Sequence, residues 1–150
     1  RIASREYFAV VHGVPNGDSG TIIGAVGRHP VDRKKYAVVS DASGRYARTH
    51  WTLVERFGDY SLLRFKLDTG RTHQIRVHCA HINHPVVGDP TYSRCRKLPV
   101  DLPGQALHAV QLGLDHPITG ERMVFDAPLP PVMEKLLLVL RRRAGASSPV

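Results

Sequence analysis

Residues 67–78 read LDTGRTHQIRVH, and the spacing of apolar residues changes within this stretch. Residues 60–67 follow a period of two, which predicts a β-strand. Beyond residue 72 the apolar residues Ile75, Cys79 and Ile82 recur at helical spacing, which predicts the buried stripe of a helix. A strand that passes through a glycine-containing loop into a helix is therefore expected.

Both ends of this helix have sequence signals. Thr72 is expected to cap the N-terminus, because a threonine oxygen can accept a hydrogen bond from a free backbone N–H group of the first turn. The helix is expected to stop near His84, since Pro85 disfavours the α conformation in the residue before it. The predicted helix has about three turns.

The rest of the sequence predicts more strands than helices. A last helix is expected to begin at Pro130-Pro131 and to end before Gly145, with residues 144–150 as a disordered tail. Its expected buried side chains are Val132, Met133, Leu136, Leu137 and Leu140. Six further segments predict strands by alternation or by β-branched and aromatic content: 6–12, 21–26, 36–40, 45–55, 107–114 and 122–125. Short turns join most of them, which indicates an α+β fold with a mostly antiparallel or mixed sheet and helices packed on one side.

Length and composition indicate one folded domain. The chain has 150 residues, of which 42% are hydrophobic and 23% charged, values typical of a globular protein. The longest strongly apolar run, residues 136–140, is far shorter than the roughly 20 residues that cross a bilayer, and residues 1–10 lack a secretory signal. Neither membrane insertion nor export is indicated. Two cysteines, Cys79 and Cys95, suit a reducing compartment, so a cytoplasmic location is expected, or an organelle in a eukaryote.

The charge predicts a polyanionic partner. Lys and Arg total 21 against 13 Asp and Glu, which gives a net charge of +8. Basic residues gather at 28–35, 94–97 and 141–143, and such clusters attract nucleic acid through counterion release. The alternative is a solvated basic surface, and residues 141–143 are better explained as cations that complement a helix C-terminus.

The stretch at 67–78 also predicts an anion site. A glycine loop leads into a helix N-terminus, where Arg71, His73 and Arg76 converge with free backbone N–H groups. Arg76 can make a bidentate contact with a carboxylate or a phosphate. The alternative is that Arg76 pairs with a nearby aspartate and only holds the loop.

Four histidines in this region do not predict a metal site. His73, His78, His81 and His84 share a helix face only in part, and no acidic partner follows at the spacing of zinc proteases. Hydrogen-bonding or RNA-facing roles are expected for them instead. No sequence context of a hydrolase surrounds any serine or cysteine.

Residues 67–78, followed by HPVVGDPTY at 84–92, closely resemble the signature L-x-T-G-R-T-H-Q-I-R-V-H … H-P-x-x-G-D-x-x-Y of RluA-type RNA pseudouridine synthases, especially the RluD-like branch. Supporting motifs occur in the same order on both sides. They are REYFAVVHG at 5–13, RHP at 28–30, ALHA at 106–109, HPITG at 116–120 and DAPLP at 126–130. The resemblance extends from about residue 5 to residue 140.

The resemblance implies an enzyme that isomerises uridine to pseudouridine in structured RNA, without cofactor or metal. Ribosomal RNA is the expected substrate, and tRNA is the alternative. By motif match, Arg76 resembles the arginine that pairs with the catalytic aspartate, and Tyr7 the tyrosine that stacks on the uracil and can remove the C5 proton. Leu107 resembles an apolar residue of the base pocket. Arg71, His73 and Gln74 resemble backbone and nucleotide contacts. Without the resemblance, core packing explains Tyr7 and Leu107.

One part of the family pattern is missing from the sequence. The H-R-L-D type motif that carries the nucleophilic aspartate precedes the Tyr7 motif in the family, and none of the aspartates here lies in such a context. Residues 1–143 are therefore expected to be the C-terminal portion of a catalytic domain, inactive when isolated. The alternatives are a non-catalytic RNA-binding module with the synthase fold and a protein-interaction domain whose positive charge is incidental.

Overall fold

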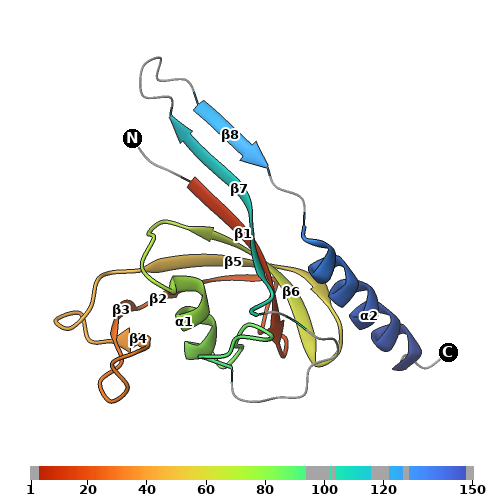
Figure 1. The fold of residues 1–150 in the computed structure, drawn as a ribbon, viewed down its shortest axis with the longest axis horizontal. Helices are drawn as coiled ribbons and strands as arrows, with labels where there is room; N and C mark the ends of the chain where they lie inside the picture. The colour runs from red at the N-terminus through yellow and green to blue at the C-terminus, as the bar shows by residue number, and fades with distance from the viewer. Residues whose placement is uncertain (1–3, 94–101, 103, 116–121, 127–128, 148–150) are drawn as a thin grey trace.

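The structure is a computed structural model that describes residues 4–93, 102, 104–115, 122–126 and 129–147. Its centre is a six-stranded sheet, whose neighbouring strands are all antiparallel, in the order β2-β5-β6-β1-β7-β8 (Figure 1). The strands are β1 (Ser4–His12), β2 (Ser19–Ile23), β5 (Arg48–Arg56), β6 (Tyr60–Leu67), β7 (Leu107–Asp115) and β8 (Arg122–Asp126). The α+β class predicted from the sequence is confirmed.

The central strands β1 and β6 carry a core on each face of the sheet. Ala9 of β1 and Phe65 of β6 belong to a buried cluster that includes Ile75 of α1 (Gln74–His81). The residues of opposite orientation, Val10 and Leu62, belong to a second cluster with α2 (Pro131–Ser147). Successive side chains of a strand point to opposite faces, so the two helices cover opposite faces of the sheet. The expectation that the helices share one side is wrong.

The strand predicted at residues 21–26 is divided in two at Gly24. β2 pairs with β5 in the main sheet, whereas β3 (Ala25–Arg28) pairs with β4 (Tyr36–Val39) in a separate two-stranded sheet. Gly24 sits at the corner, where its N–H donates to the carbonyl of Ala47 (3.1 Å) and its carbonyl accepts from His78 Nε2 (2.9 Å). A Cβ at this position would lie 2.9 Å from a methyl group of Val38. The close approach explains why the corner falls on a glycine.

Helix α1 is shorter than predicted and begins one residue later. Its N-cap is His73, which has a left-handed backbone (φ 56°) and makes no side-chain capping bond, so the assignment of Thr72 as the N-cap is wrong. The predicted apolar stripe is confirmed, because Ile75 and Cys79 are buried and Ile82 packs against the same cluster. The helix ends at His81, ahead of Pro85.

Helix α2 starts at Pro131, as predicted, but continues to Ser147. Four of its expected core residues are buried, whereas Val132 is only partly buried. The helix therefore includes the first four residues of the predicted disordered tail, and residues 148–150 lie outside the described residues. One glycine costs a helix about 1 kcal/mol, which a helix anchored by Met133, Leu136, Leu137 and Leu140 tolerates.

Two further predictions concern turns between strands. The β5–β6 hairpin is confirmed, with Gly58 in a left-handed conformation (φ 76°) at its turn. The turn predicted at 116–120 lies outside the described residues. Within the described part of the chain, no helix has the length and apolar character needed to span a bilayer.

Candidate active site

A cavity of about 150 Å³ lies where β1, the end of β6, the start of α1 and the start of β7 meet. We call it the motif cavity, because all six residues singled out in the sequence line it. These six are Tyr7, Arg71, His73, Gln74, Arg76 and Leu107, and the lining is completed by Leu67, Gly70 and Ile75. A cavity of this volume accommodates a ring the size of benzene, so it is large enough for a single pyrimidine base.

Strand geometry directs Tyr7 and Leu107 into this space. Tyr7 pairs with Phe65 of β6 on one side and with Ala109 of β7 on the other, and a β-bulge interrupts the β1–β7 register at Glu6 and Tyr7. Bulges alter the direction of side chains and are frequent beside active sites. Tyr7 is half-buried, and within the described residues its hydroxyl group has no hydrogen bond. The hydroxyl is therefore available to a ligand.

Arg76 is held by an aspartate of the same chain. Its Nε and Nη2 donate to the two carboxylate oxygens of Asp89 at 2.8 and 2.9 Å. The Asp89 side chain is fully buried and that of Arg76 is 12% exposed. The loop-holding alternative is thus present in the structure, and Asp89 is its partner. A carboxylate contributed from outside the chain stays a prediction.

Asp89 is ionised although it is buried. Burial opposes the charge, but the hydrogen bond from Arg76 and those from the backbone N–H groups of Thr91 (2.9 Å) and Tyr92 (3.1 Å) outweigh it, so the pKa of Asp89 is lowered. The same hydrogen bond raises the pKa of Arg76. Because the Asp89 carboxylate is buried and bonded at both oxygens, it serves to orient Arg76 and is not accessible to a substrate.

Tyr92 contacts His73 through its hydroxyl group. The Tyr92 hydroxyl oxygen accepts a hydrogen bond from the backbone N–H of Tyr36 (3.0 Å), and the same hydroxyl is 2.8 Å from Nδ1 of His73. The hydroxyl hydrogen can then be donated to Nδ1, an arrangement in which the His73 proton lies on Nε2. Burial and the positive charge of Arg76 lower the pKa of His73 and favour this neutral form. His73 thus supplies the motif cavity with an uncharged imidazole.

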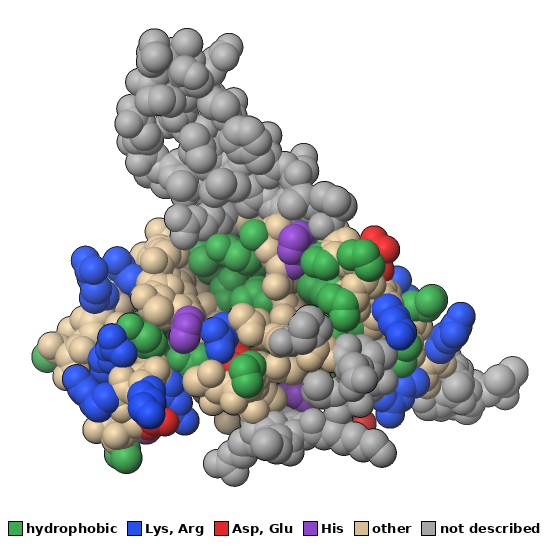
Figure 2. Space-filling model, in the orientation of Figure 1, with side chains coloured by type: hydrophobic (Ala, Val, Ile, Leu, Met, Phe, Trp, Pro, Cys, Tyr) green, Lys and Arg blue, Asp and Glu red, His purple; other side chains and the backbone are tan. Residues whose placement is uncertain are grey.

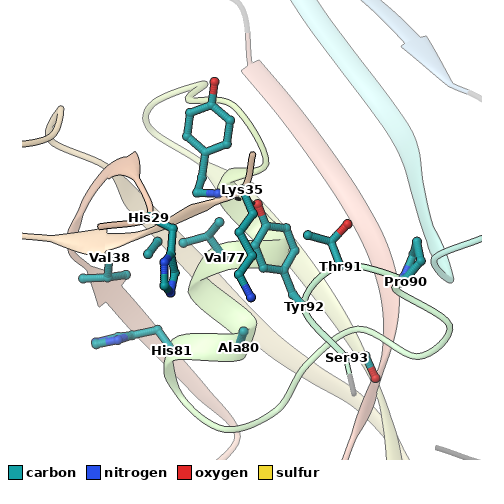
Figure 3. Close-up of a pocket in the computed structure, with 12 residues that line it drawn as sticks. His29, Lys35, Val38, Val77, Ala80, His81, Pro90, Thr91, Tyr92 and Ser93 are labelled. Atoms are coloured by element: carbon teal, nitrogen blue, oxygen red, sulfur yellow. Dashed lines mark hydrogen bonds between the residues drawn. The ribbon is translucent and has the colours of Figure 1, made fainter. Parts of the chain in front are cut away.

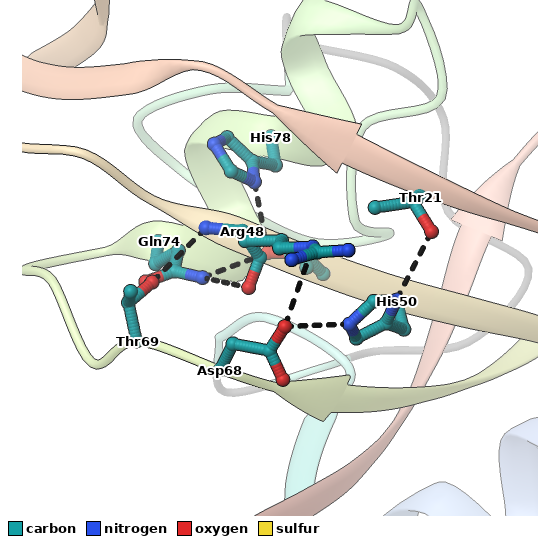
Figure 4. Close-up of polar contacts among 8 residues, drawn as sticks. Thr21, Arg48, His50, Asp68, Thr69, Gln74 and His78 are labelled. Carbon is teal, nitrogen blue, oxygen red and sulfur yellow. Dashed lines mark hydrogen bonds and ion pairs between the residues drawn. The ribbon is translucent and has the colours of Figure 1, made fainter.

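Gln74 braces the loop that leads into α1. Its Oε1 accepts from Thr69 Oγ1 (2.7 Å) and the backbone N–H of Arg71 (3.0 Å), and its Nε2 donates to Thr49 Oγ1 (2.9 Å) and the carbonyl of Arg48 (3.1 Å). Figure 4 shows this side chain bridging the loop and β5. Every hydrogen-bonding position of the amide is filled, so Gln74 positions the loop, and a direct contact with a nucleotide stays a prediction.

The same region is tied to the sheet by a second set of contacts. Asp68 accepts from His50 Nε2 (2.7 Å) and forms an ion pair with Arg48 (3.4 Å), while His50 Nδ1 is bonded to Thr21 (3.0 Å) (Figure 4). Arg71 donates from Nε to the carbonyl of Tyr46 (2.7 Å). The end of β6 and the following loop are therefore fixed to β2 and β5, which sets the position of the cavity wall.

A family model described as RNA pseudouridylate synthase matches residues 1–81, more than half of the 150 residues of the chain. The chain belongs to the RNA pseudouridylate synthase family.

Full-length relatives support the same membership. An uncharacterized RNA pseudouridine synthase of Synechocystis is 51% identical over 144 residues, an alignment that covers 95% of this chain and 44% of the relative. The ribosomal large subunit pseudouridine synthase D of Pseudomonas aeruginosa is 48% identical over 153 residues, which cover 95% of this chain and 47% of the relative. The chain spans about half the length of the curated relatives it matches.

Solved structures share the fold. The human RNA pseudouridylate synthase domain containing 1 has a TM-score of 0.70 and 26% identity, covering 98% of this chain and 67% of the human one. The human RNA pseudouridylate synthase domain containing 4 has a TM-score of 0.72 over 93% of this chain and 62% of its own, with 22% identity, and is similar in fold.

Three of the four histidines around α1 in this pseudouridylate synthase chain have separate partners. His73 bonds Tyr92, His78 is buried between Thr49 Oγ1 (2.8 Å) and Gly24, and His84 Nδ1 contacts the carbonyl of His12 (2.9 Å). Among the described residues, no group of three or more His, Cys, Asp or Glu side chains could hold a metal ion. His78 therefore has a structural role at the corner between β2 and β3.

Two functional positions were not identified from the sequence. Asp89 and Tyr92 were quoted only as letters of the motif GDPTY at 88–92, without roles. Asp89 is the partner of Arg76, and Tyr92 contacts both His73 and, through its ring at 5.1 Å, the guanidinium of Arg76. The one available signal was the polar composition of a motif that follows α1, since the 13-residue separation from Arg76 gives no local indication of contact.

Proposed function

We propose that the protein containing this chain isomerises uridine to pseudouridine in RNA, and that the motif cavity receives the target base. In this reaction the N1–C1′ bond of uridine breaks, a C5–C1′ bond forms, C5 loses a proton and N1 gains one. The balance needs no oxidant or reductant. The main support is that six residues taken from three separate sequence motifs line one cavity large enough for a pyrimidine ring.

The geometry suggests a role for each side chain in the cavity. Tyr7 has an aromatic ring and a hydroxyl group that makes no hydrogen bond to the described residues, which suit it to stacking on the base and to moving the C5 proton. His73 offers an Nε2–H donor that a uracil carbonyl could accept. Leu107, which is half-buried, supplies apolar surface beside Tyr7.

We further propose that the nucleophilic carboxylate comes from residues N-terminal to Arg1. Asp89 uses Nε and Nη2 of Arg76, and within the described residues Nη1 has no hydrogen bond. Nη1 belongs to a residue that lines the cavity. It is the group that a carboxylate beside the target ribose would meet, while Asp89 keeps the guanidinium oriented.

The proposed substrate is ribosomal RNA of the large subunit. This assignment is supported by the name of the Pseudomonas aeruginosa relative, a ribosomal large subunit pseudouridine synthase, and by the net charge of +8 of this chain. Flipping a base out of its stack costs a few kcal/mol, and a basic surface that holds the flanking strand offsets that cost.

The proposed reaction is tested by tritium release from RNA that contains 5-tritiated uridine. The full-length protein is expected to release tritium. The isolated 150 residues are expected to bind the RNA but to release no tritium. Loss of a general base lowers a rate by about 10²- to 10⁴-fold, so Tyr7→Phe should slow release by that factor. Tyr60→Phe, on β6 and outside the lining of the motif cavity, is the control. Tritium release by the isolated chain would refute the external nucleophile, and an inactive full-length protein would refute the reaction.

A further inference from the structure

A second cavity, of about 450 Å³, lies between the β3–β4 hairpin and the residues around α1 (Figure 3). We call it the hairpin cleft. Its polar and aromatic lining comes from His29, Lys35 and Tyr36 of the hairpin, His81 of α1 and Tyr92. None of the described residues that line it is acidic. The cleft is therefore an electropositive space with aromatic walls.

Basic side chains also surround the mouth of the cleft. Residues 28–35 contain two arginines and two lysines but one carboxylate, Asp32. Figure 2 shows the Lys and Arg side chains concentrated over the β3–β4 hairpin, to the left of the apolar centre of this face. Such a concentration of one sign of charge attracts a polyanion over a distance of about 10 Å at an ionic strength of about 0.1 M.

The hairpin cleft and the motif cavity share a wall. His73 lines the motif cavity, and its ring lies 5.5 Å from that of Tyr36 and 5.6 Å from that of Tyr92, both of which line the hairpin cleft. Arg76, also in the motif cavity, lies 5.1 Å from the Tyr92 ring. An RNA strand that leaves the motif cavity can therefore enter the hairpin cleft by passing over the single layer of side chains that separates the two.

Local contacts prepare two groups of the cleft for a ligand. His29 Nδ1 accepts hydrogen bonds from the backbone N–H groups of Val31 (3.1 Å) and Asp32 (3.0 Å), so the His29 proton lies on Nε2. Arg28 lies 4.8 Å from the Tyr36 ring and steadies it by a cation–π contact. The cleft thus contains a fixed N–H donor, an ordered ring and the cation of Lys35.

We propose that the hairpin cleft is a second RNA subsite, which holds the nucleotide next to the target uridine, with its phosphate on Lys35 and its base against Tyr36 and Tyr92. The proposal rests on the proposed function, because it takes the motif cavity as the site of the uridine. Aromatic rings interspersed with cations suit single-stranded nucleic acid, whose bases stack while its phosphates pair with the cations. An acidic peptide would use the cations and leave the rings without a partner.

The first test compares Lys35→Gln with Lys34→Gln in the full-length protein. Both variants remove one positive charge from the same hairpin, but only Lys35 lines the cleft, and Lys34 is exposed. The dissociation constants of single-stranded RNA oligomers containing one uridine are measured over a series of salt concentrations. Each lost phosphate contact on a single strand reduces the slope of log K against log salt by about 0.7.

Lys35→Gln is expected to weaken binding and to reduce this slope by about 0.7, whereas Lys34→Gln should leave the slope unchanged. Equal effects of the two variants would overturn the subsite, because they would indicate a diffuse basic surface. Binding of a polyglutamate peptide that depends on Lys35, without such dependence for RNA, would overturn the assignment of the ligand.

The second test uses Tyr36→Ala and Tyr36→Phe. Loss of a stacking ring weakens binding of a base by roughly 5- to 150-fold, so the alanine variant should bind the oligomers more weakly by that factor and the phenylalanine variant should bind normally. Equal binding by both variants would overturn the role of the ring. Far-UV circular dichroism checks that Tyr36→Ala is folded. If it is not, the comparison of Lys35→Gln with Lys34→Gln, which alters surface side chains only, decides whether the subsite exists.

The length of the RNA provides the third test. The effect of Lys35→Gln should be absent with uridine monophosphate and should begin when one nucleotide is added on the side that enters the cleft. An equal loss of affinity for uridine monophosphate would overturn the proposal, since Lys35 would then contact the target nucleotide itself. None of these measurements needs catalysis, so a wild-type protein that releases no tritium would refute the proposed reaction alone.

Discussion

Two arginine–carboxylate pairs of this protein have nearly the same bond lengths but opposite environments. Arg76 contacts Asp89 beside the motif cavity at 2.8 and 2.9 Å, and Arg141 of α2 contacts Glu55 of β5 at 2.9 and 3.1 Å. The side chains of the first pair are 12% and 0% exposed, and those of the second are 50% and 36% exposed.

This difference in exposure determines what each pair can do. Water screens the charges of Arg141 and Glu55, and exposed pairs contribute about 0–1 kcal/mol to stability. Asp89 has no contact with water, so its charge depends on Arg76 and on the backbone N–H groups of Thr91 and Tyr92. The buried pair therefore fixes the orientation of a cavity residue, whereas the exposed pair adds an interchangeable contact between α2 and the sheet.

The largest difference is expected when each carboxylate is removed. Asp89→Ala leaves the Arg76 guanidinium without its partner in a mostly buried position and should lower the free energy of unfolding by about 3 kcal/mol, the lower end for a broken buried pair because Arg76 retains some exposure. Glu55→Ala should cost less than about 1 kcal/mol. Urea unfolding of the two variants beside the wild type measures both values, and equal losses would show that burial does not distinguish the pairs.

A smaller difference is expected when each arginine is replaced by lysine. A lysine keeps the charge but cannot donate two parallel bonds, so Arg76→Lys should cost about 1–2 kcal/mol and lower the melting temperature by about 2–4 °C per kcal/mol. Arg141→Lys should change the melting temperature little, since its pair is screened by water. Thermal melts followed by circular dichroism test this, and a larger shift for Arg141→Lys would contradict the comparison.

Tyr92→Phe sharpens the comparison by leaving the buried pair intact while removing the hydroxyl beside it. The backbone N–H of Tyr36 then loses its acceptor, which should cost about 1 kcal/mol. His73 should also lose its single tautomer, and nitrogen NMR of the imidazole should show the proton shared between Nδ1 and Nε2. Tyr60→Phe is the control, because the Tyr60 hydroxyl has no hydrogen bond within the described residues; an unchanged His73 spectrum in Tyr92→Phe would exclude the tautomer lock.

The smallest effect is expected from pH, because burial of Asp89 cancels part of what its hydrogen bonds contribute to ionisation. Its pKa is lower in the folded state than the ordinary 3.8. The folded protein therefore holds fewer protons than the unfolded chain in this range. The resulting stability is fully present above pH 3.8 and is lost as the pH falls through the folded pKa. Unfolding free energies of the wild type and Asp89→Asn between pH 6 and pH 2.5 should converge at the acidic end, and a constant difference would contradict the lowered pKa.

Most strands and both helices could be predicted because their signals are local. Residues 60–67 show a period of two within one strand, and Ile75, Cys79 and Ile82 show helical spacing around one helix. In both cases the side chains predicted to be apolar and inward-facing pack against the core. The division of residues 21–26 was missed, since the corner at Gly24 depends on Ala47 and His78, which lie more than 20 residues away. The N-cap at Thr72 was wrong because Gln74, by bonding Thr69 and Arg71, satisfies the loop from inside the helix.

The candidate site was predicted by motif resemblance more completely than by residue chemistry. Arg76 was expected to bind a carboxylate. The sequence contains nine aspartates, however, and does not indicate which of them lies beside Arg76. The choice of Asp89 depends on the path of the chain after α1, where the backbone N–H groups of Thr91 and Tyr92 make a buried carboxylate tolerable. Such compensation cannot be read from one-dimensional spacing.

By itself, the sequence determined the α+β class and the basic character, because periodicity and charge are properties of the chain alone. Its resemblance to a known family singled out the six residues that line the motif cavity. Only the tertiary structure decided that Asp89 orients Arg76, that the Tyr92 hydroxyl contacts Nδ1 of His73 and that a basic cleft lies behind the same wall. The reason is physical: burial and hydrogen-bond geometry depend on neighbours brought together by the fold, and those neighbours are distant in the sequence.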